Sequence, residues 1–393
     1  MVKQKTRSAV SHLDAPFSVL DLDAALANAK DMTRRATPTP IRLASKSIRI
    51  RSLISRILGL PGYQGILSFN INEAMWLVET NTCDDILVAY PTANRTAIRR
   101  LIESDRFRET ITLMVDSLAH LDLIDSVVPP SQRGSVRICM DIDASLALGP
   151  IHVGALRSPL HSVQQAREFA KHIIARDGFS FIGVMAYEGQ IAGTTDTSPA
   201  IGVMKKISGT ELAERRGQIV AAIEEELAAA GKPALEFVNG GGTGSIETTS
   251  AEAAITEIGA GSGVVAPGLF DHYKTFSPEP AEWFVLPVVR RPAADTVTVA
   301  GGGRVASGPP GKDRLPKVDY PEGLKMAPME GPGEVQTPLT GKAARSLHLG
   351  DHVWFRHAKG GEQAEWCEQV LVVSDGKIID EWPTYRGEGK SFT

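Results

Sequence analysis

Short apolar runs alternate with amphipathic, helix-like runs from residue 17 to about residue 265. The apolar runs are short and end at turn or cap residues, and each is followed by apolar residues spaced three or four positions apart. Strands are expected at 17–21, 41–45, 65–69, 85–91, 111–116, 136–143, 179–189, 234–242 and 256–265. Strand–helix alternation predicts parallel strands, in an open sheet or a closed barrel. About eight units over roughly 250 residues favour an α/β fold of the (β/α)8 type, over residues 15–276.

The pattern changes after residue 276. Helical periodicity disappears, and segments rich in proline and glycine separate further strand-like runs at 284–292, 296–303, 352–357, 368–373 and 377–385. The sequence therefore predicts a C-terminal all-β domain over residues 277–393. Residues 1–14 are expected to form an N-terminal tail before the barrel.

Composition and charge exclude several classes of protein. The net charge is −4 at pH 7, so electrostatics indicate neither a nucleic-acid partner nor a membrane surface. Three scattered cysteines form neither a disulfide framework nor a zinc motif, and they suit a reducing cytoplasm. No secretory signal and no membrane span are expected, because no apolar stretch is long enough.

A glycine-rich loop follows the expected strand at 234–242. Phosphates often bind at the loops after the last strands of such a barrel, where backbone N–H groups face the anion. Gly242, Thr243 and Gly244 are therefore predicted to donate to a phosphate. A second loop, 259–263, contains Gly261 and Ser262 and could close the other side of the site. The alternative is a plain tight turn.

Two other phosphate-binding motifs do not fit the glycine-rich loop. A dinucleotide fingerprint comes early in its βαβ unit, whereas this loop is late and has Ser245 in place of the last glycine. The nucleotide phosphate loop needs Gly-Lys followed by Ser or Thr, which is absent from the sequence.

Six segments, in order, resemble one group of enzymes. They are PFSVLDLDAALANAKDM, PIRLASKSIRI, DDILVAYP, GVMAYEGQ, EFVNGGGTGS and ITEIGAGSG. Together they resemble the alanine-racemase-like, fold-type III enzymes that use pyridoxal 5'-phosphate (PLP), in the branch of D-threonine aldolase and D-serine dehydratase. The resemblance spans nearly the whole chain and is weakest over 292–345. It implies a PLP-binding barrel and a homodimer.

The resemblance assigns a role to three side chains. Lys46 matches the lysine that forms a Schiff base with PLP, a role that requires an amine with a tunable pKa. Tyr187 matches a tyrosine that contacts the ring nitrogen of the cofactor. Arg157 is a candidate for the ring oxygen of the cofactor or the substrate carboxylate. The alternatives are an exposed lysine among neighbouring arginines, a buried structural tyrosine and an exposed loop arginine.

The sequence departs from this branch at the metal site, where the branch has His-x-Cys or His-x-Asp. His357 is the only family-type ligand retained, because Lys359 replaces the second ligand and a protonated lysine repels a dication. Cys367 and His352 are poorly placed substitutes, since strand alternation puts His352 on the opposite face. Gln190 also replaces a histidine of the branch.

We therefore expect a metal-independent site, in which Lys359 takes the place of the metal and His357 acts as acid or base. A metal site built on His357 and a site without either group are the alternatives.

The predicted function is that of a PLP-dependent lyase acting on small β-hydroxy D-amino acids. The reaction is either retro-aldol cleavage or dehydration with deamination, through a Schiff base at Lys46. An amino-acid racemase is the first alternative, with Tyr385 or Tyr320 as its second base, and a non-catalytic PLP-binding protein is another. The C-terminal tail either folds back to the partner's site or is solvated.

Overall fold

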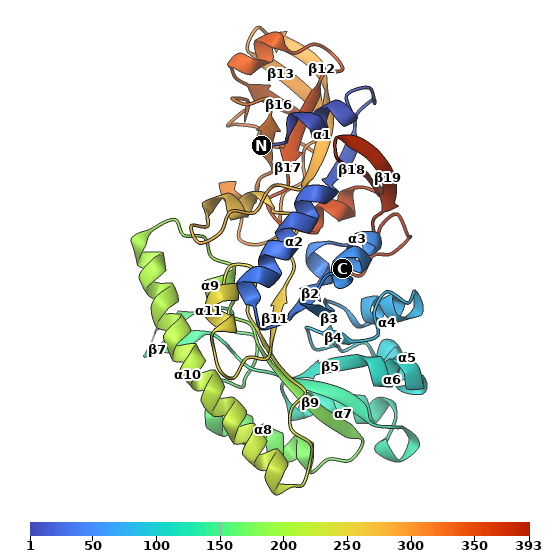
Figure 1. Cartoon of the computed structure of the whole chain (residues 1–393), viewed down its shortest axis with the longest axis vertical. Helices are drawn as coiled ribbons and strands as arrows, with labels where there is room; N and C mark the ends of the chain where they lie inside the picture. Colours follow the sequence, from blue (N-terminus) through green and yellow to red (C-terminus); the bar gives the residue numbers. More distant parts are fainter. Residues whose placement is uncertain (150) are drawn as a thin grey trace. The chain divides into compact units, whose positions relative to one another are not determined.

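The computed structural model describes residues 1–149 and 151–393 (Figure 1). The chain divides into two compact units. The sheet unit comprises residues 1–31, 46–54 and 262–391. The barrel unit comprises residues 32–45, 55–261 and 392–393.

The barrel unit contains the predicted barrel. Among its described residues, eight parallel strands close on themselves, so the predicted (β/α)8-type fold is confirmed. Around the barrel the strands are β10 (Phe237–Gly240), β11 (Glu257–Ala260), β2 (Ile41–Ala44), β3 (Tyr63–Ser68), β4 (Ile86–Val88), β5 (Ile111–Val115), β6 (Val136–Asp141) and β9 (Phe179–Ala186). The first and last strands in the chain, β2 and β11, pair with each other and close the ring.

Helices follow most of the barrel strands. Those that lie wholly in this unit are α4 (Ile71–Glu79), α5 (Arg95–Glu103), α6 (Asp105–Thr110), α7 (Leu118–Val127), α8 (Val163–Ile174), α9 (Gly189–Ala192), α10 (Pro199–Ala229) and α11 (Ile246–Ser250). The long helix α10 runs along α8 (Figure 1). Side-chain oxygens of Asn70, Asn94, Ser162 and Ser198 accept from the first turns of α4, α5, α8 and α10, which explains where these helices begin. A short hairpin, β7 (Leu146–Leu148) and β8 (Ile151–Val153), is inserted after β6.

A buried ion pair joins the two closing strands. Arg42 on β2 donates through Nε and Nη2 to the carboxylate of Glu257 on β11, over 2.7 and 2.9 Å. Asn239 on β10 and Gln64 on β3 donate to the same carboxylate. One charged group thereby connects four neighbouring strands, and its side chain has no exposed surface.

The sheet unit is built around a nine-stranded sheet. Its main path is β15 (Lys325–Met326), β16 (Gln336–Thr340), β13 (Thr296–Ala300), β12 (Glu282–Ala293), β1 (Phe17–Asp21), β18 (Gln369–Ser374) and β19 (Lys377–Pro383). Strand β17 (His352–Arg356) pairs with β12 and with β14 (Lys317–Tyr320). The sheet is mostly antiparallel, as predicted for the C-terminal domain.

One strand prediction is wrong. Residues 17–21, expected as the first barrel strand, form β1, which pairs with β12 and β18 of the sheet unit. Val19 packs there with Trp283 and Leu371. A short apolar run followed by a helix is typical of a βα unit, but the strands with which it pairs lie more than 250 residues away in the sequence, so the local pattern does not reveal them. Lys46 therefore follows the first barrel strand and Tyr187 the sixth. The predicted domain limits stay a prediction.

Both ends of the chain are ordered. Residues 1–14 include α1 (Gln4–Ala9), and Val2 and Val10 belong to the core of the sheet unit. Tyr385 near the C-terminus is 1% exposed, and its N–H donates to the carbonyl of Arg49. Within the described residues, no helix combines the length and apolarity that crossing a membrane would require.

We expect Arg42→Met to lower the free energy of unfolding by about 3–5 kcal/mol, because it leaves the Glu257 charge buried and unpaired. The control is Arg99→Met, whose side chain is 55% exposed and lies 4.0 Å from Glu103; this change should cost at most about 1 kcal/mol. Urea unfolding followed by circular dichroism measures both. Equal unfolding midpoints would contradict the structural weight given to the Arg42–Glu257 pair.

Candidate active site

Lys46 lies on a backbone turn that its neighbours hold firmly. It is the middle residue of a single 3-10 turn (Ser45–Ser47) directly after β2, and it is exposed while Ile48 and Arg49 are buried. Nε of Arg49 donates to the carbonyl of Lys46 over 3.1 Å. A Cβ at Gly361 would come within 2.0 Å of that carbonyl, so only glycine fits there. The backbone at Lys46 is thus fixed while the residue itself is exposed.

Lys359 lies in the same unit and within electrostatic range of Lys46. Its Nζ donates to Ser307 Oγ over 3.0 Å and is 3.9 Å from Glu362. Burial lowers the pKa of Lys359, and the charge of Lys46 adds to the effect. The predicted residues Lys46 and Lys359 are therefore brought together. Ser262 joins them, because Gly360 is close to both Ser47 and Ser262.

His357 is buried beside Lys359. Its Nδ1 lies 2.8 Å from the Lys359 carbonyl oxygen and 3.2 Å from the Lys359 nitrogen. In the neutral tautomer that donates from Nδ1 to the carbonyl, Nε2 is an acceptor, and this atom is buried without a partner among the described residues. Burial lowers the pKa of His357 and so favours the neutral ring.

The residues around His357 do not fit a divalent metal. Among residues 1–149 and 151–393 there is no group of three His, Cys, Asp or Glu side chains that could hold one. His352 lies instead beside Phe17 and contacts the carbonyl of Leu13. Burial raises the pKa of the Cys367 thiol to about 11, which disfavours the thiolate that binds metals.

In the barrel unit, the glycine-rich loop is shaped by protein contacts. A Cβ at Gly240 would meet Ile255 at 2.8 Å, and one at Gly242 would meet Ala192 at 2.7 Å. Gly241 has φ +84°, which favours glycine. The absence of side chains is therefore explained by packing of the loop on its own barrel unit.

A buried carboxylate organises this loop. Glu188, 1% exposed, accepts from Gly241 N–H, Ser245 Oγ, Thr249 Oγ1 and Nη2 of Arg216, over 2.5–3.1 Å. Gly242 N–H in turn donates to Ser245 Oγ. Of the predicted phosphate donors, Gly242 is thus engaged within the loop.

A second ion pair holds the loop from the outside. Arg35 on α2 (Leu22–Ala36) donates to the carbonyl of Thr243 over 2.9 Å and pairs with Glu247 over 2.6 Å. Together with the hydrogen bonds to Glu188, these contacts hold the loop in one conformation.

Tyr187 stands beside the glycine-rich loop. A Cβ at Gly242 would come within 3.3 Å of the Tyr187 ring, and Gly189 is equally close on another side. The tyrosine is 39% exposed, and the burial of its hydroxyl raises its pKa to about 12, so the phenol stays neutral. Arg157 lies within electrostatic range of Tyr187 and over the ring of Tyr90, at 5.9 Å.

Two other predicted residues have structural contacts. A Cβ at Gly261 would meet the carbonyl of Ala44 at 2.5 Å. Gln190, 7% exposed, donates to the carbonyl of Ala144 and to Ser208 Oγ. Gln190 therefore supports the loop after β6 and takes no part in proton transfer.

The sequence analysis missed three kinds of residue. Glu188 was detectable, because a charged residue directly follows a buried strand. Asp141 ends β6 in the same way and lies within range of Arg157. Arg304 carried no sequence signal, since it lies where the resemblance is weakest.

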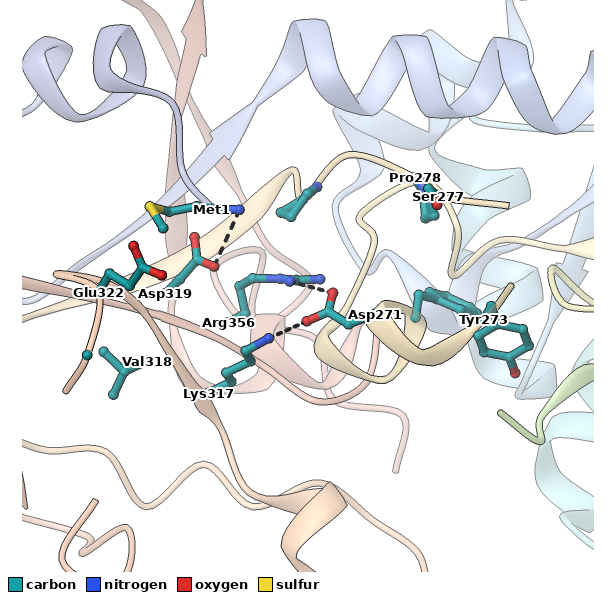
Figure 2. Close-up of a pocket in the computed structure, with 13 residues that line it drawn as sticks. Met1, Asp271, Tyr273, Ser277, Pro278, Lys317, Val318, Asp319, Glu322 and Arg356 are labelled. Carbon is teal, nitrogen blue, oxygen red and sulfur yellow. Dashed lines mark hydrogen bonds and ion pairs between the residues drawn. The ribbon is translucent and has the colours of Figure 1, made fainter. Parts of the chain in front are cut away.

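A pocket lies in the sheet unit, apart from these residues. Figure 2 shows this pocket, of about 490 Å³, with Asp271 between Arg356 and Lys317, at 2.7 and 2.5 Å. The charges of Arg356 and Lys317 are both paired with that of Asp271. No predicted site residue is among those that line it in the described chain.

Solved structures with this architecture identify the fold. D-threonine aldolase of Filomicrobium marinum superposes with a TM-score of 0.78 at 19% identity, over 95% of each chain. D-threo-3-hydroxyaspartate dehydratase of Delftia sp. HT23 gives 0.73 at 20% identity, over 96% of this chain and 98% of that one. The fold is that of D-threonine aldolase. The resemblance inferred from the sequence is confirmed at this level.

Two curated proteins are similar in sequence, and their alignments cover less of the chain than the structural superpositions do. The 3-hydroxy-D-aspartate aldolase of Paracoccus denitrificans (strain Pd 1222) is 27% identical over 264 residues, which are 64% of this chain and 60% of that protein. D-threonine aldolase of an Arthrobacter species is 24% identical over 319 residues, 79% and 78% of the two chains. The chain therefore spans about three fifths of the first relative. No family model matches the chain.

The pH dependence of stability tests the burial of Asp141. Burial raises the pKa of Asp141 to about 7, with help from Asp116 and Asp143 and opposition from Arg157. Between about pH 4 and pH 7 the unfolded chain releases this proton and the native chain keeps it, so stability falls as pH rises. Asp141→Asn should therefore stabilise the protein by about 2–4 kcal/mol at pH 8 and leave it unchanged at pH 4.

Urea unfolding at pH 4, 6 and 8 measures this difference. Asp84→Asn serves as the control, because Asp84 is exposed, and it should show no pH-dependent gain. A gain for Asp141→Asn that is the same at all three pH values would show that the carboxylate is ionised throughout.

Proposed function

We propose that this chain is a PLP-dependent lyase that cleaves or dehydrates β-hydroxy D-amino acids. The observation that carries the proposal is the exposed Lys46, on a backbone held by Arg49 and Gly361 directly after the first strand of a D-threonine aldolase fold. The activities of two similar proteins, an aldolase for 3-hydroxy-D-aspartate and a dehydratase for D-threo-3-hydroxyaspartate, support the substrate class.

The residues fit the cofactor as follows. Lys46 would hold it covalently, and Gly242, Thr243 and Gly244 would hold its phosphate on the loop that Glu188 and Arg35 keep rigid. Tyr187 would contact the ring nitrogen, and Arg157, Gly261 and Ser262 would complete the binding set. When bound, PLP supplies an electron sink for the bond that breaks at Cα.

The chain's own residues supply binding and proton transfer. The amine of Lys46 takes or returns the proton at the amino-acid nitrogen or Cα. Tyr187, neutral because its pKa is raised to about 12, offers the ring nitrogen a hydrogen bond and no charge. His357, neutral because burial lowers its pKa, can accept a proton at Nε2. Lys359 supplies positive charge next to Lys46.

We further propose that the reaction needs no divalent metal. The support is the donor set: Lys359 and Arg304 both act on His357 as cations, and the Cys367 thiol is protonated. Two cations next to a single imidazole oppose the binding of a third.

A lyase is favoured over a racemase, because the candidate second bases are engaged. Tyr385 is 1% exposed, and the Tyr320 ring is covered by the guanidinium of Arg7 at 3.6 Å. We also propose a homodimer, as the resemblance implies, acting in the cytoplasm, which the scattered cysteines suit.

Cofactor attachment is the first test. The purified protein should turn yellow with PLP, and borohydride should then fix one pyridoxyl group on Lys46, measured by peptide mass spectrometry. Lys46→Ala should abolish both signals, and Lys232→Ala, at an exposed lysine, should change neither. Labelling of another lysine at the same yield would refute the assignment.

A product assay distinguishes the reactions. With β-hydroxy D-amino acids we expect either glycine plus aldehyde or ammonia plus keto acid. Activity should survive EDTA, because the residues present do not make a divalent site. Loss of activity with EDTA that manganese or zinc restores would refute the metal-free reaction, and loss of optical rotation without cleavage would indicate a racemase.

A further inference from the structure

One face of the sheet is an apolar core that ends in buried polar side chains. Phe284 on β12 lies opposite Phe355 on β17, and the two rings stack 5.0 Å apart with an interplanar angle of 8°. Side chains two residues apart along a strand point to the same face. Glu282, two residues before Phe284, and His357, two after Phe355, therefore continue this face on the same side.

Arg304 reaches this face from the loop after β13. Its guanidinium carbon lies 4.3 Å from the centre of the Phe284 ring, so the cation is held by the aromatic ring. Within the described chain the guanidinium has no carboxylate within 4.0 Å, and its Nη1 is buried without a hydrogen-bond partner. Burial lowers the pKa of Arg304, with only weak compensation from Cys367 and Glu282.

Three acceptor atoms in the described part of the chain are likewise buried without a hydrogen-bond partner. Oε1 of Glu282, Nε2 of His357 and Oε1 of Gln363 are buried and have no partner among the described residues. The three residues are 8%, 5% and 1% exposed. Gln363 is held in place, because its Nε2 donates to Ser18 Oγ over 2.9 Å, and Ser18 lies opposite Phe284 in the sheet.

One bound group could pair with all four atoms, the Arg304 donor and the three acceptors. Most buried polar atoms in native proteins are paired, and each unpaired one is costly. The charges are coupled, since Arg304 acts on both Glu282 and His357. A divalent cation is opposed by Arg304, and a simple anion is opposed by the three acceptors. A hydroxyl suits the set, because its oxygen accepts from a guanidinium while its proton is donated to an acceptor.

The position relative to Lys46 identifies the source of that hydroxyl. Gln363 belongs to the short helical turn Glu362–Trp366, which starts beside Gly361. Gly361 in turn contacts the carbonyl of Lys46. Lys359, two residues from His357, is within electrostatic range of Lys46. His357 and Gln363 thus belong to a segment that packs on the turn carrying the reactive amine.

We propose that Glu282, Arg304, His357 and Gln363 form a subsite for the β-hydroxyl group of the amino-acid substrate, with Arg304 as the donor to its oxygen. This inference rests on the proposed function and deepens it, because it assigns hydroxyl recognition to residues of the chain. Arg304 is then a specificity-determining residue.

The test compares amino acids that differ only in the hydroxyl group. D-threonine and D-2-aminobutyrate are titrated into the PLP-loaded protein, and the change in absorbance of the bound cofactor gives each Kd. In the wild type, D-threonine should bind more tightly. Arg304→Met should remove about tenfold to a hundredfold of this preference, the range expected for one charged hydrogen bond, and leave the Kd of D-2-aminobutyrate unchanged.

Controls separate the possible failures. Arg290→Met, at an exposed position of β12, the strand that carries Glu282, should keep the full preference. If the wild type takes up no PLP, the proposed function fails. If it binds PLP at Lys46 but Arg304→Met keeps the preference, the subsite fails and ordered water occupies it. Binding of one equivalent of Mn²⁺ or Zn²⁺ that Glu282→Gln weakens would also overturn the subsite.

A second measurement needs no cofactor. Replacing both Glu282 and Arg304 by methionine removes two unpaired polar groups, so the melting temperature of the protein should stay equal or rise. A large fall in melting temperature, together with unchanged preference for D-threonine in Arg304→Lys, would show that the residues are structural. Arg304→Lys should instead lose most of the preference, because a shorter, compact ammonium does not reproduce the guanidinium geometry.

Discussion

The bidentate ion pair between Arg42 and Glu257 closes the barrel. It connects the first and last strands of a ring whose other contacts are backbone hydrogen bonds and apolar packing, and Asn239 and Gln64 complete the hydrogen bonding of its carboxylate. A buried charge of this kind fixes register, because a slip of one residue would leave an ion without its partner. The loops that leave these strands, including the turn at Lys46 and the approach to Gly261, inherit that register.

Local sequence predicted the barrel because its signals are local. Each strand is a short apolar run and each helix a periodic one, so the alternation was readable without knowing any partner. The strand at residues 17–21 was misassigned because its pattern is the same, while its partners Trp283 and Leu371 are remote in sequence. The antiparallel C-terminal sheet was predicted for the same reason as the barrel, from strand-like runs separated by proline and glycine.

The candidate site likewise contains residues that the sequence indicates and residues that only the fold brings together. Lys46, Tyr187 and the glycines stand in motifs that a reader can recognise. The residues that hold them in place do not stand in recognisable motifs. Ile255 and Ala192 leave no room for side chains at the glycines, and Glu188 and Arg35 hold the loop. Residues such as Arg304 and Glu282 meet only through the sheet and carry no motif. A sequence pattern therefore indicates which residues react, and three-dimensional packing determines which residues hold them.

A guanidinium in the proposed hydroxyl subsite has a consequence for how such a site works. A metal site is assembled from deprotonated ligands and can be emptied, whereas a guanidinium stays charged at every physiological pH and cannot leave. A permanent cation in a buried face destabilises the fold unless an opposing group is near, and Glu282 acts electrostatically on Arg304 without forming an ion pair with it. The unpaired atoms are then a local cost that a substrate hydroxyl removes, so that binding a hydroxy amino acid is favoured over binding its unsubstituted analogue.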